Sequence, residues 1–222
     1  MNHSQRAHRG PAANLRFLVP ALLAALLVVP AAFAQTWTEA GDAGDLVATA
    51  QVTAGVGPLV TINGVLSGHG DVDVYCIQLS ATPPAGLPLV SINCLAMADP
   101  TIYLFSAASL GLNANMTCAL GVKQVVAPNV SLAPGMYYVA VAAFDRLPQS
   151  IGGDIWQTVL SGPLAPNGPG AGSPLIGWAG PSTFVSPVPY TLNVNPNYFN
   201  FCDAVTSSEA TSWGSLKARY GS

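Results

Sequence analysis

The stretch Gly68–Leu79, GHGDVDVYCIQL, decides the fold class because it joins a polar turn to a strand with alternating side chains. Glycine and aspartate at its start are typical of a turn, and β-branched and aromatic residues follow. Successive side chains of a strand point to opposite faces, so Tyr75 and Ile77 share one face and Gln78 lies on the other. We expect the Tyr75 face to be the core face, because the opposite face carries an amide.

Short apolar runs like this one recur along the chain and are separated by Gly, Pro, Asn and Asp. They predict further strands at 59–66, 89–97, 101–107, 122–126, 136–144 and 190–194. No stretch before residue 204 shows sustained helical periodicity. The sequence therefore predicts an all-β fold, an antiparallel β-sandwich of the jelly-roll type in a single domain.

The segment 161–189 is too rich in Pro and Gly for a regular element, so we expect a long surface loop. Trp178 lies within it. A packing role that holds the loop to the sandwich and a stacking role toward a ligand are the two interpretations of this side chain, and we favour packing.

The first 34 residues are typical of an export signal. Basic residues precede the apolar segment 17–29, FLVPALLAALLVV, and the small residues AFA end at Ala34. We expect cleavage after Ala34, an exported sandwich domain at 35–203 and a C-terminal tail at 204–222. An uncleaved membrane anchor is the alternative.

Charge excludes two classes of partner. Beyond residue 34 the sequence has four basic residues against ten acids, a formal charge of −6. A chain of this sign lacks the basic surface that nucleic acids and anionic lipids require. It suits an exported protein that binds cations.

Four cysteines follow the signal, Cys76, Cys94, Cys118 and Cys202. An even number in an exported chain predicts two disulfides, for which three pairings exist. We suggest Cys76 with Cys94 across a hairpin, which leaves Cys118 with Cys202.

The tail differs in pattern from the domain. Trp213, Leu216 and Tyr220 have helical spacing beside basic residues, which predicts a short amphipathic helix that docks on a sorting or surface partner. A frayed terminus is the alternative.

Four segments, WTEAGDAGDLVATAQ (37–51), GDVDVYCIQL (70–79), DPTIYLFSA (99–107) and LAPGMYYVAV (132–141), occur in the order found in one known family. They resemble the bacterial pre-peptidase C-terminal domain, most closely its secreted variant known as the DVUA0089 family. The resemblance covers about residues 37–195. It implies an exported β-sandwich without catalytic activity, and related modules bind extracellular matrix proteins.

Some relatives bind calcium between an acidic segment and an Asp-containing turn. Carried over by position, the resemblance implies Ca²⁺ ligands at Glu39, Asp42, Asp45, Asp71 and Asp73. Calcium takes about six to eight oxygen ligands, which carboxylates and loop carbonyls supply. The alternative is that these aspartates only cap turns by accepting hydrogen bonds from backbone N–H groups.

Two other groups of residues are candidates for chemistry. A small secreted hydrolase would use either the carboxylate pair Asp71 and Asp73, as glycoside hydrolysis requires, or His69 in a triad with one of these aspartates, although no Gly-x-Ser-x-Gly motif accompanies it. A second loop contains a tryptophan among charged residues, which suits sugar or peptide recognition, or else packing at the edge of the core. Its candidate ligand-binding residues are Asp145, Arg146, Asp154 and Trp156.

The sequence thus predicts an exported, non-enzymatic binding module for an extracellular protein or polysaccharide, with two disulfides, and the family resemblance adds a calcium site to which turn-capping aspartates are the alternative. A small secreted hydrolase is the alternative from another class. A structural component of a surface layer is the third.

Overall fold

The structure is a computed structural model. It describes residues 35–68, 70–94, 99–118, 121–127, 131–144, 146–158, 162–180 and 187–204. The predicted export signal, His69, Asp145 and residues 205–222 of the predicted tail lie outside the described residues. Every regular element within them is a β-strand, so the predicted all-β class is confirmed.

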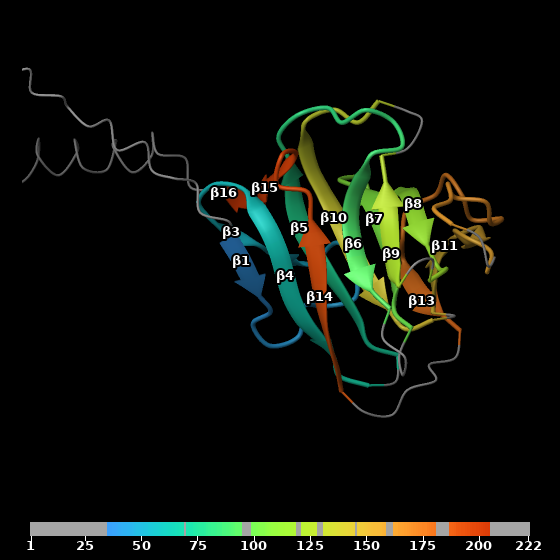
Figure 1. Cartoon of the computed structure of the whole chain (residues 1–222). Helices are drawn as coiled ribbons and strands as arrows, with labels where there is room; N and C mark the ends of the chain where they lie inside the picture. The colour runs from blue at the N-terminus through green and yellow to red at the C-terminus, as the bar shows by residue number, and fades with distance from the viewer. Residues whose placement is uncertain are drawn as a thin grey trace, which may run out of the picture. The chain divides into compact units, whose positions relative to one another are not determined.

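Two sheets pack face to face as a sandwich (Figure 1). Sheet A has the order β1 (Gln35–Thr38), β4 (Leu59–Leu66), β14 (Val188–Val194), β6 (Pro88–Asn93), β9 (Val122–Val126). Sheet B has the order β15 (Phe199–Phe201), β5 (Val72–Leu79), β10 (Gly135–Ala142), β7 (Thr101–Ser106), β8 (Gly111–Asn115), and β2 (Gln51–Val52) also pairs with β5. Most pairings are antiparallel, as predicted, but β1 joins β4 and β2 joins β5 in parallel.

Two small sheets complete the described strands. One contains β12 (Gly153–Asp154), β11 (Leu147–Ser150) and β13 (Gly177–Ala179), and the other contains β3 (Ala54–Gly55) and β16 (Asp203–Ala204). β13 lies inside the segment that we expected to be a loop without regular structure. It forms because Gly177–Ala179 pair with Leu147–Gln149 of β11.

The main core lies between sheets A and B. Tyr75 and Ile77 of β5 point into it, as predicted, with Val139 of β10, Ile62 of β4 and Leu192 of β14 from the neighbouring strands. Each of these side chains is fully buried. Burial of an aliphatic or aromatic side chain of this size stabilises the fold by about 1.5–3 kcal/mol, so this layer is the main source of stability.

The opposite face of β5 is also buried, which corrects the expectation of a single core face. Val72 and Val74 pack in a second apolar cluster with Trp156, Tyr103 and Phe105. We had expected this face to be outside the core because it contains Gln78. Gln78, however, lies near the end of the strand and is half-buried. Sheet B is therefore the middle layer of the molecule.

Side-chain amides join the two sheets at one edge. Asn113 of β8 accepts a hydrogen bond from the backbone N–H of Val126 in β9 at 3.0 Å, and Asn115 donates to the carbonyl of Gln124 at 2.9 Å. These bonds satisfy backbone groups on the outer edge of β9, which an edge strand otherwise presents to other chains.

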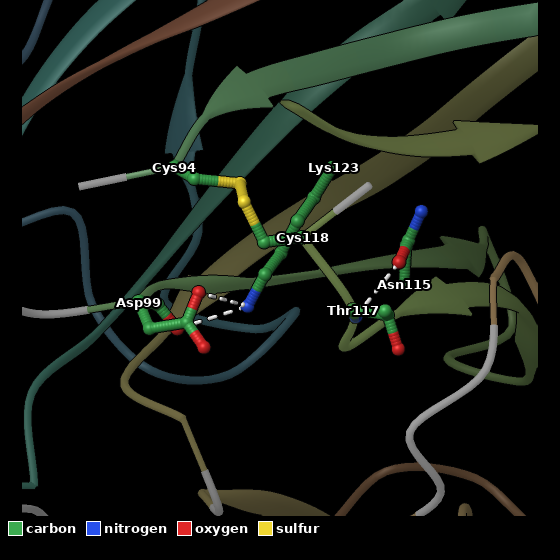
Figure 2. Close-up of polar contacts among 6 residues, drawn as sticks. All are labelled: Cys94, Asp99, Asn115, Thr117, Cys118 and Lys123. Carbon is green, nitrogen blue, oxygen red and sulfur yellow. Dashed lines mark hydrogen bonds and ion pairs between the residues drawn. A yellow bond between two sulfur atoms is a disulfide. The ribbon is translucent and has the colours of Figure 1, made fainter. Parts of the chain in front are cut away.

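The four cysteines form two disulfides, Cys76–Cys202 and Cys94–Cys118. The suggested pairing of Cys76 with Cys94 is wrong, because β5 and β6 belong to different sheets and Cys76 lies on the face of β5 that points away from sheet A. Cys202 directly follows β15, which pairs with β5. Figure 2 shows the second disulfide, which links the end of β6 to the segment after β8.

Among the described residues, no helix has the length and apolar character needed to span a membrane.

Candidate metal centre

The acidic loop Glu39–Gly44 lies across one end of the sandwich and touches both sheets. The backbone N–H of Glu39 donates to the carbonyl of Asn63 in β4 at 2.9 Å. The carbonyl of Gly44 accepts from the N–H of Val74 in β5 at 3.0 Å. Ala43, between them, is fully buried in the main core. The loop is therefore fixed at three points.

Two glycines allow the loop to turn this sharply. Gly41 and Gly44 have φ values of +76° and +71°, which residues with a Cβ rarely adopt. A Cβ on Gly44 would lie 2.5 Å from the carbonyl oxygen of Thr49. Asp42 stabilises the same turn, because its Oδ1 accepts a hydrogen bond from the N–H of Gly44 at 3.1 Å.

This turn brings three carboxylates together. Oxygens of Glu39, Asp42 and Asp73 all lie within 4.8 Å of one another. Glu39 is half-buried, Asp42 is exposed and Asp73 is fully buried. Glu39 is held by two backbone donors, the N–H groups of Ala43 at 3.0 Å and Val65 at 2.8 Å. The cluster thus joins the loop to the start of β5.

Asp73 is the unusual member, because it points into the main core. Its Oδ2 accepts a hydrogen bond from the Tyr190 hydroxyl at 2.6 Å, and the hydroxyls of Tyr190 and Tyr75 lie 2.8 Å apart. Its Oδ1 is buried and has no hydrogen-bond partner among the described residues. A buried carboxylate oxygen without a partner carries a large desolvation penalty.

A glycine makes room for the two tyrosines. A Cβ on Gly64 of β4 would lie 2.4 Å from both the Tyr190 and the Tyr75 hydroxyl oxygens. The tyrosine hydroxyls therefore pack directly against the backbone of sheet A. This packing fixes the orientation of the Asp73 carboxylate.

The surroundings of Asp73 disfavour its ionised form. Burial raises the pKa of the Asp73 carboxyl to about 8. The hydrogen bond from Tyr190 opposes this shift, and the negative charges of Glu39, Asp71 and Asp42 add to it. Burial also raises the pKa of Tyr75 and Tyr190, so both hydroxyls stay protonated and act as donors.

The donor set fits a hard divalent cation. In the described part of the chain no salt bridge involves the three carboxylates. Oxygen-only ligands and high negative charge are what Ca²⁺ and Mg²⁺ prefer, and the unpartnered Oδ1 of Asp73 offers a ligand atom already free of water. A cation here would offset both the burial that raises the pKa of Asp73 and the repulsion from nearby carboxylates that adds to this rise.

The structure places the other two acids of the predicted calcium set outside this cluster. Asp45 is exposed, and its carbonyl accepts a hydrogen bond from the Trp178 indole at 2.5 Å. Asp71 accepts a hydrogen bond from the N–H of Ser67, which closes the turn before β5. Three of the five predicted acids therefore meet, and Asp71 has the turn-capping role that was the alternative.

The second candidate loop does not form a recognition surface around its tryptophan. Trp156 is fully buried against Tyr103, with ring centroids 5.4 Å apart, which agrees with its packing interpretation and not with an exposed recognition residue. Asp154 accepts a hydrogen bond from Gln149, and Arg146 donates to the carbonyl of Gly180 at 3.2 Å. These side chains hold the covering layer on sheet B.

Sequence reasoning missed Tyr190 and Gly64 as parts of the site. Tyr190 shares a face of its strand with Leu192 and was expected only as a strand residue. The signal that would have found it is the polar tip of a tyrosine at a core position, which needs a buried partner. Nothing in the sequence alone marks Gly64 as the contact point of two hydroxyls.

Comparison with models of known protein families finds no match for this chain, and comparison with curated proteins also finds none. The resemblance to the pre-peptidase C-terminal domain stays a prediction.

Proposed function

We propose that this chain is an exported, non-catalytic β-sandwich module that binds an extracellular protein or polysaccharide, and that Ca²⁺ holds its acidic loop on the sandwich. The observation that carries the proposal is the fully buried Asp73, whose Oδ1 has no partner among the described residues and whose carboxylate lies within 4.8 Å of oxygens of Glu39 and Asp42. A cation supplies the missing partner.

Calcium suits the cluster better than magnesium does. Magnesium demands near-ideal octahedral geometry and retains most of its water, whereas calcium accepts irregular sets of carboxylates and carbonyls. Here the three carboxylates come from a loop and a strand end, and both Glu39 and Asp42 are also bound to backbone N–H groups. This irregular set favours calcium.

The residues of the proposed site have different roles in binding the ion. Asp73 supplies the buried charge, and Tyr190 orients it by donating to its Oδ2. Glu39 and Asp42 close the site from the loop side. The ion would fasten the loop to β5, and the surface that the loop shapes would then be ready to bind a partner.

Two further points support an exported binding module. Two disulfides in one domain are compatible with an extracellular location, because thiols are kept reduced in the cytosol. The resemblance stated for residues 37–195 supports binding rather than catalysis.

The test is thermal unfolding of the purified, disulfide-bonded protein in chelator and in millimolar calcium. A ligand at 100 times its Kd stabilises the native state by about 2.7 kcal/mol, which corresponds to a rise in Tm of about 5–10 °C for a domain of this size. An unchanged Tm would contradict the proposal.

Two variants make this test specific. Asp73→Asn removes the buried charge and is expected to abolish the calcium-dependent rise in Tm. Asp45→Asn removes an exposed acid outside the cluster and is the matched control, which is expected to keep the full rise.

A further inference from the structure

A hollow of about 570 Å³ lies on sheet A beside the acidic loop, and we call it the β4–β14 hollow. β14 pairs with β4 over Val188–Asn193 but with β6 only over Leu192–Val194. The hollow lies where β6 has separated from β14, and both strands contribute to its lining. Its volume falls in the range of about 300–1,000 Å³ that is typical of small-molecule sites.

Neutral hydrogen-bonding side chains line the hollow from three strands and the end of a fourth. They include Thr38, Asn63, Asn93 and Thr191. The Thr191 hydroxyl donates to Oδ1 of Asn63 at 2.8 Å, which fixes the amide. No described residue accepts a hydrogen bond from the amide nitrogen of Asn63, so this group is oriented and free to donate to a ligand.

The charge of the lining selects the class of ligand. Glu39 is the only charged side chain among the described residues that line the hollow, so an anionic ligand would meet no cation there. Val65 and Pro189 add exposed apolar surface beside the amides and hydroxyls. A sugar ring has the matching surface, since it combines apolar C–H faces with neutral hydroxyls.

A peptide strand fits less well. The edge of β14 that faces the hollow contains Pro189, which has no backbone N–H to donate. The ladder that an added strand would form is interrupted at that position. We therefore propose that the β4–β14 hollow binds a neutral saccharide through the side chains of Asn63 and Thr191.

The acidic loop gives this site a dependence on calcium. Glu39 and Gly41 form one wall of the hollow, and Glu39 also belongs to the carboxylate cluster. An ion that fastens the loop fixes this wall in place. This dependence rests on the proposed function, whereas the hydrogen-bonding set of Asn63 and Thr191 does not.

The experiment probes the purified, disulfide-bonded protein on an array of oligosaccharides, in millimolar calcium and in chelator. Neutral gluco-, manno-, galacto- and N-acetylglucosamine oligosaccharides are compared with the acidic glycans heparin and hyaluronan. We expect binding to a neutral glycan in calcium and a loss of that binding in chelator.

Two variants locate the site. Asn63→Ala removes the oriented amide and is expected to weaken binding about five- to tenfold, which is the effect of one hydrogen bond to a ligand. Asn193→Ala removes an exposed amide two residues along β14 from Thr191, outside the hollow, and is expected to leave binding unchanged.

Calcium uptake is measured on the same samples by the shift in Tm, so the two proposals fail separately. A protein that takes up calcium but binds no neutral glycan, prefers acidic glycans, or binds equally well as Asn63→Ala contradicts the saccharide site alone. A protein whose Tm does not respond to calcium contradicts the proposed function. If such a protein still binds a neutral glycan through Asn63, the saccharide site stands and its dependence on calcium is overturned.

Discussion

Lys123 and Asp73 are both fully buried ionisable residues of one sandwich, but their surroundings differ. Lys123 on β9 points toward Asp99, as Figure 2 shows, with its Nζ 2.8 Å from Oδ1 and 3.1 Å from the backbone carbonyl of that residue. The Phe144 ring lies 5.6 Å from the same Nζ. The amine therefore has a counter-ion, an acceptor and an aromatic face.

Asp73 has the opposite surroundings. The charges that act on it are those of Glu39, Asp71 and Asp42, all of the same sign as its own. A buried charge without a partner costs several kcal/mol unless it is neutralised by a proton or a counter-ion. Lys123 thus has a counter-ion within the chain. Asp73 has none among the charges that act on it, so we infer that its counter-ion is a bound cation.

The largest effect is expected when the lysine loses its counter-ion. Asp99→Asn leaves the Lys123 amine buried without an opposite charge, and the expected loss is about 3 kcal/mol in the free energy of unfolding. Asn tolerates the positive φ of +36° at this position, so the backbone preference is kept. Urea denaturation measures the change.

Removal of the other partner of this ion pair is the matched control. Lys123→Met leaves Asp99, which is 46% exposed and can regain water, so a smaller loss is expected. Equal losses in the two variants would show that the pair matters by its packing and not by its charge.

The second effect is a dependence of stability on pH in the absence of calcium. The Asp73 carboxyl has a pKa of about 8 in the folded protein, against about 3.9 in the unfolded chain. Between these values the folded state binds more protons, so the free energy of unfolding falls as the pH rises from about 4 to about 8.

At about 1.4 kcal/mol per pH unit, this group alone contributes a fall of about 2–3 kcal/mol between pH 5 and pH 7. Denaturation of the wild type and of Asp73→Asn across this range, in chelator, measures the contribution as the difference between the two curves. Parallel curves would contradict the pKa shift of Asp73.

The third effect tests the tyrosine pair that orients Asp73. Gly64→Ala places a methyl group 2.4 Å from both hydroxyl oxygens, and the expected cost is about 1–3 kcal/mol with a weaker response to calcium. Gly177→Ala is the control, because nothing lies within 4 Å of the added Cβ. A normal calcium response in Gly64→Ala would show that the tyrosines are not needed for the site.

The smallest effect is expected at the exposed end of the cluster. Asp42→Asn keeps an acceptor for the N–H of Gly44, so stability in chelator is expected to change by less than about 1 kcal/mol. Calcium affinity is expected to fall, because calcium sites are tuned by the number of charged ligands. An unchanged affinity would place the ion away from Asp42.

The sequence predicted the strands well because alternation and turn residues are local signals. The central strands β4, β5, β7 and β10 were all expected near their observed positions. The two-sided burial of β5 was not, because the layer that covers its second face comes from the distant residues Ile155, Trp156 and Leu175. The disulfide pairing was wrong for the same reason, since it depends on which strands share a sheet.

The candidate site was found in part. The acids of the 39–45 loop and of the turn before β5 were recognised as a group, and three of the five meet. The choice of the three acids that meet depends on the shape of the loop, which is set by positive φ angles at Gly41 and Gly44. The sequence does not specify these angles. The partners of Asp73 come from a strand more than a hundred residues later, as the sequence separation of 117 between Asp73 and Tyr190 shows.

Isothermal titration of the protein with calcium at pH 7, in two buffers of different ionisation enthalpy, tests the central claim most directly. If the buried Asp73 carboxyl is a ligand of the ion, one ion binds per chain and releases most of one proton, because the carboxyl is largely protonated before binding. Asp73→Asn should bind weakly and release none. Absence of binding, or binding without proton release that Asp73→Asn leaves unchanged, would contradict the account.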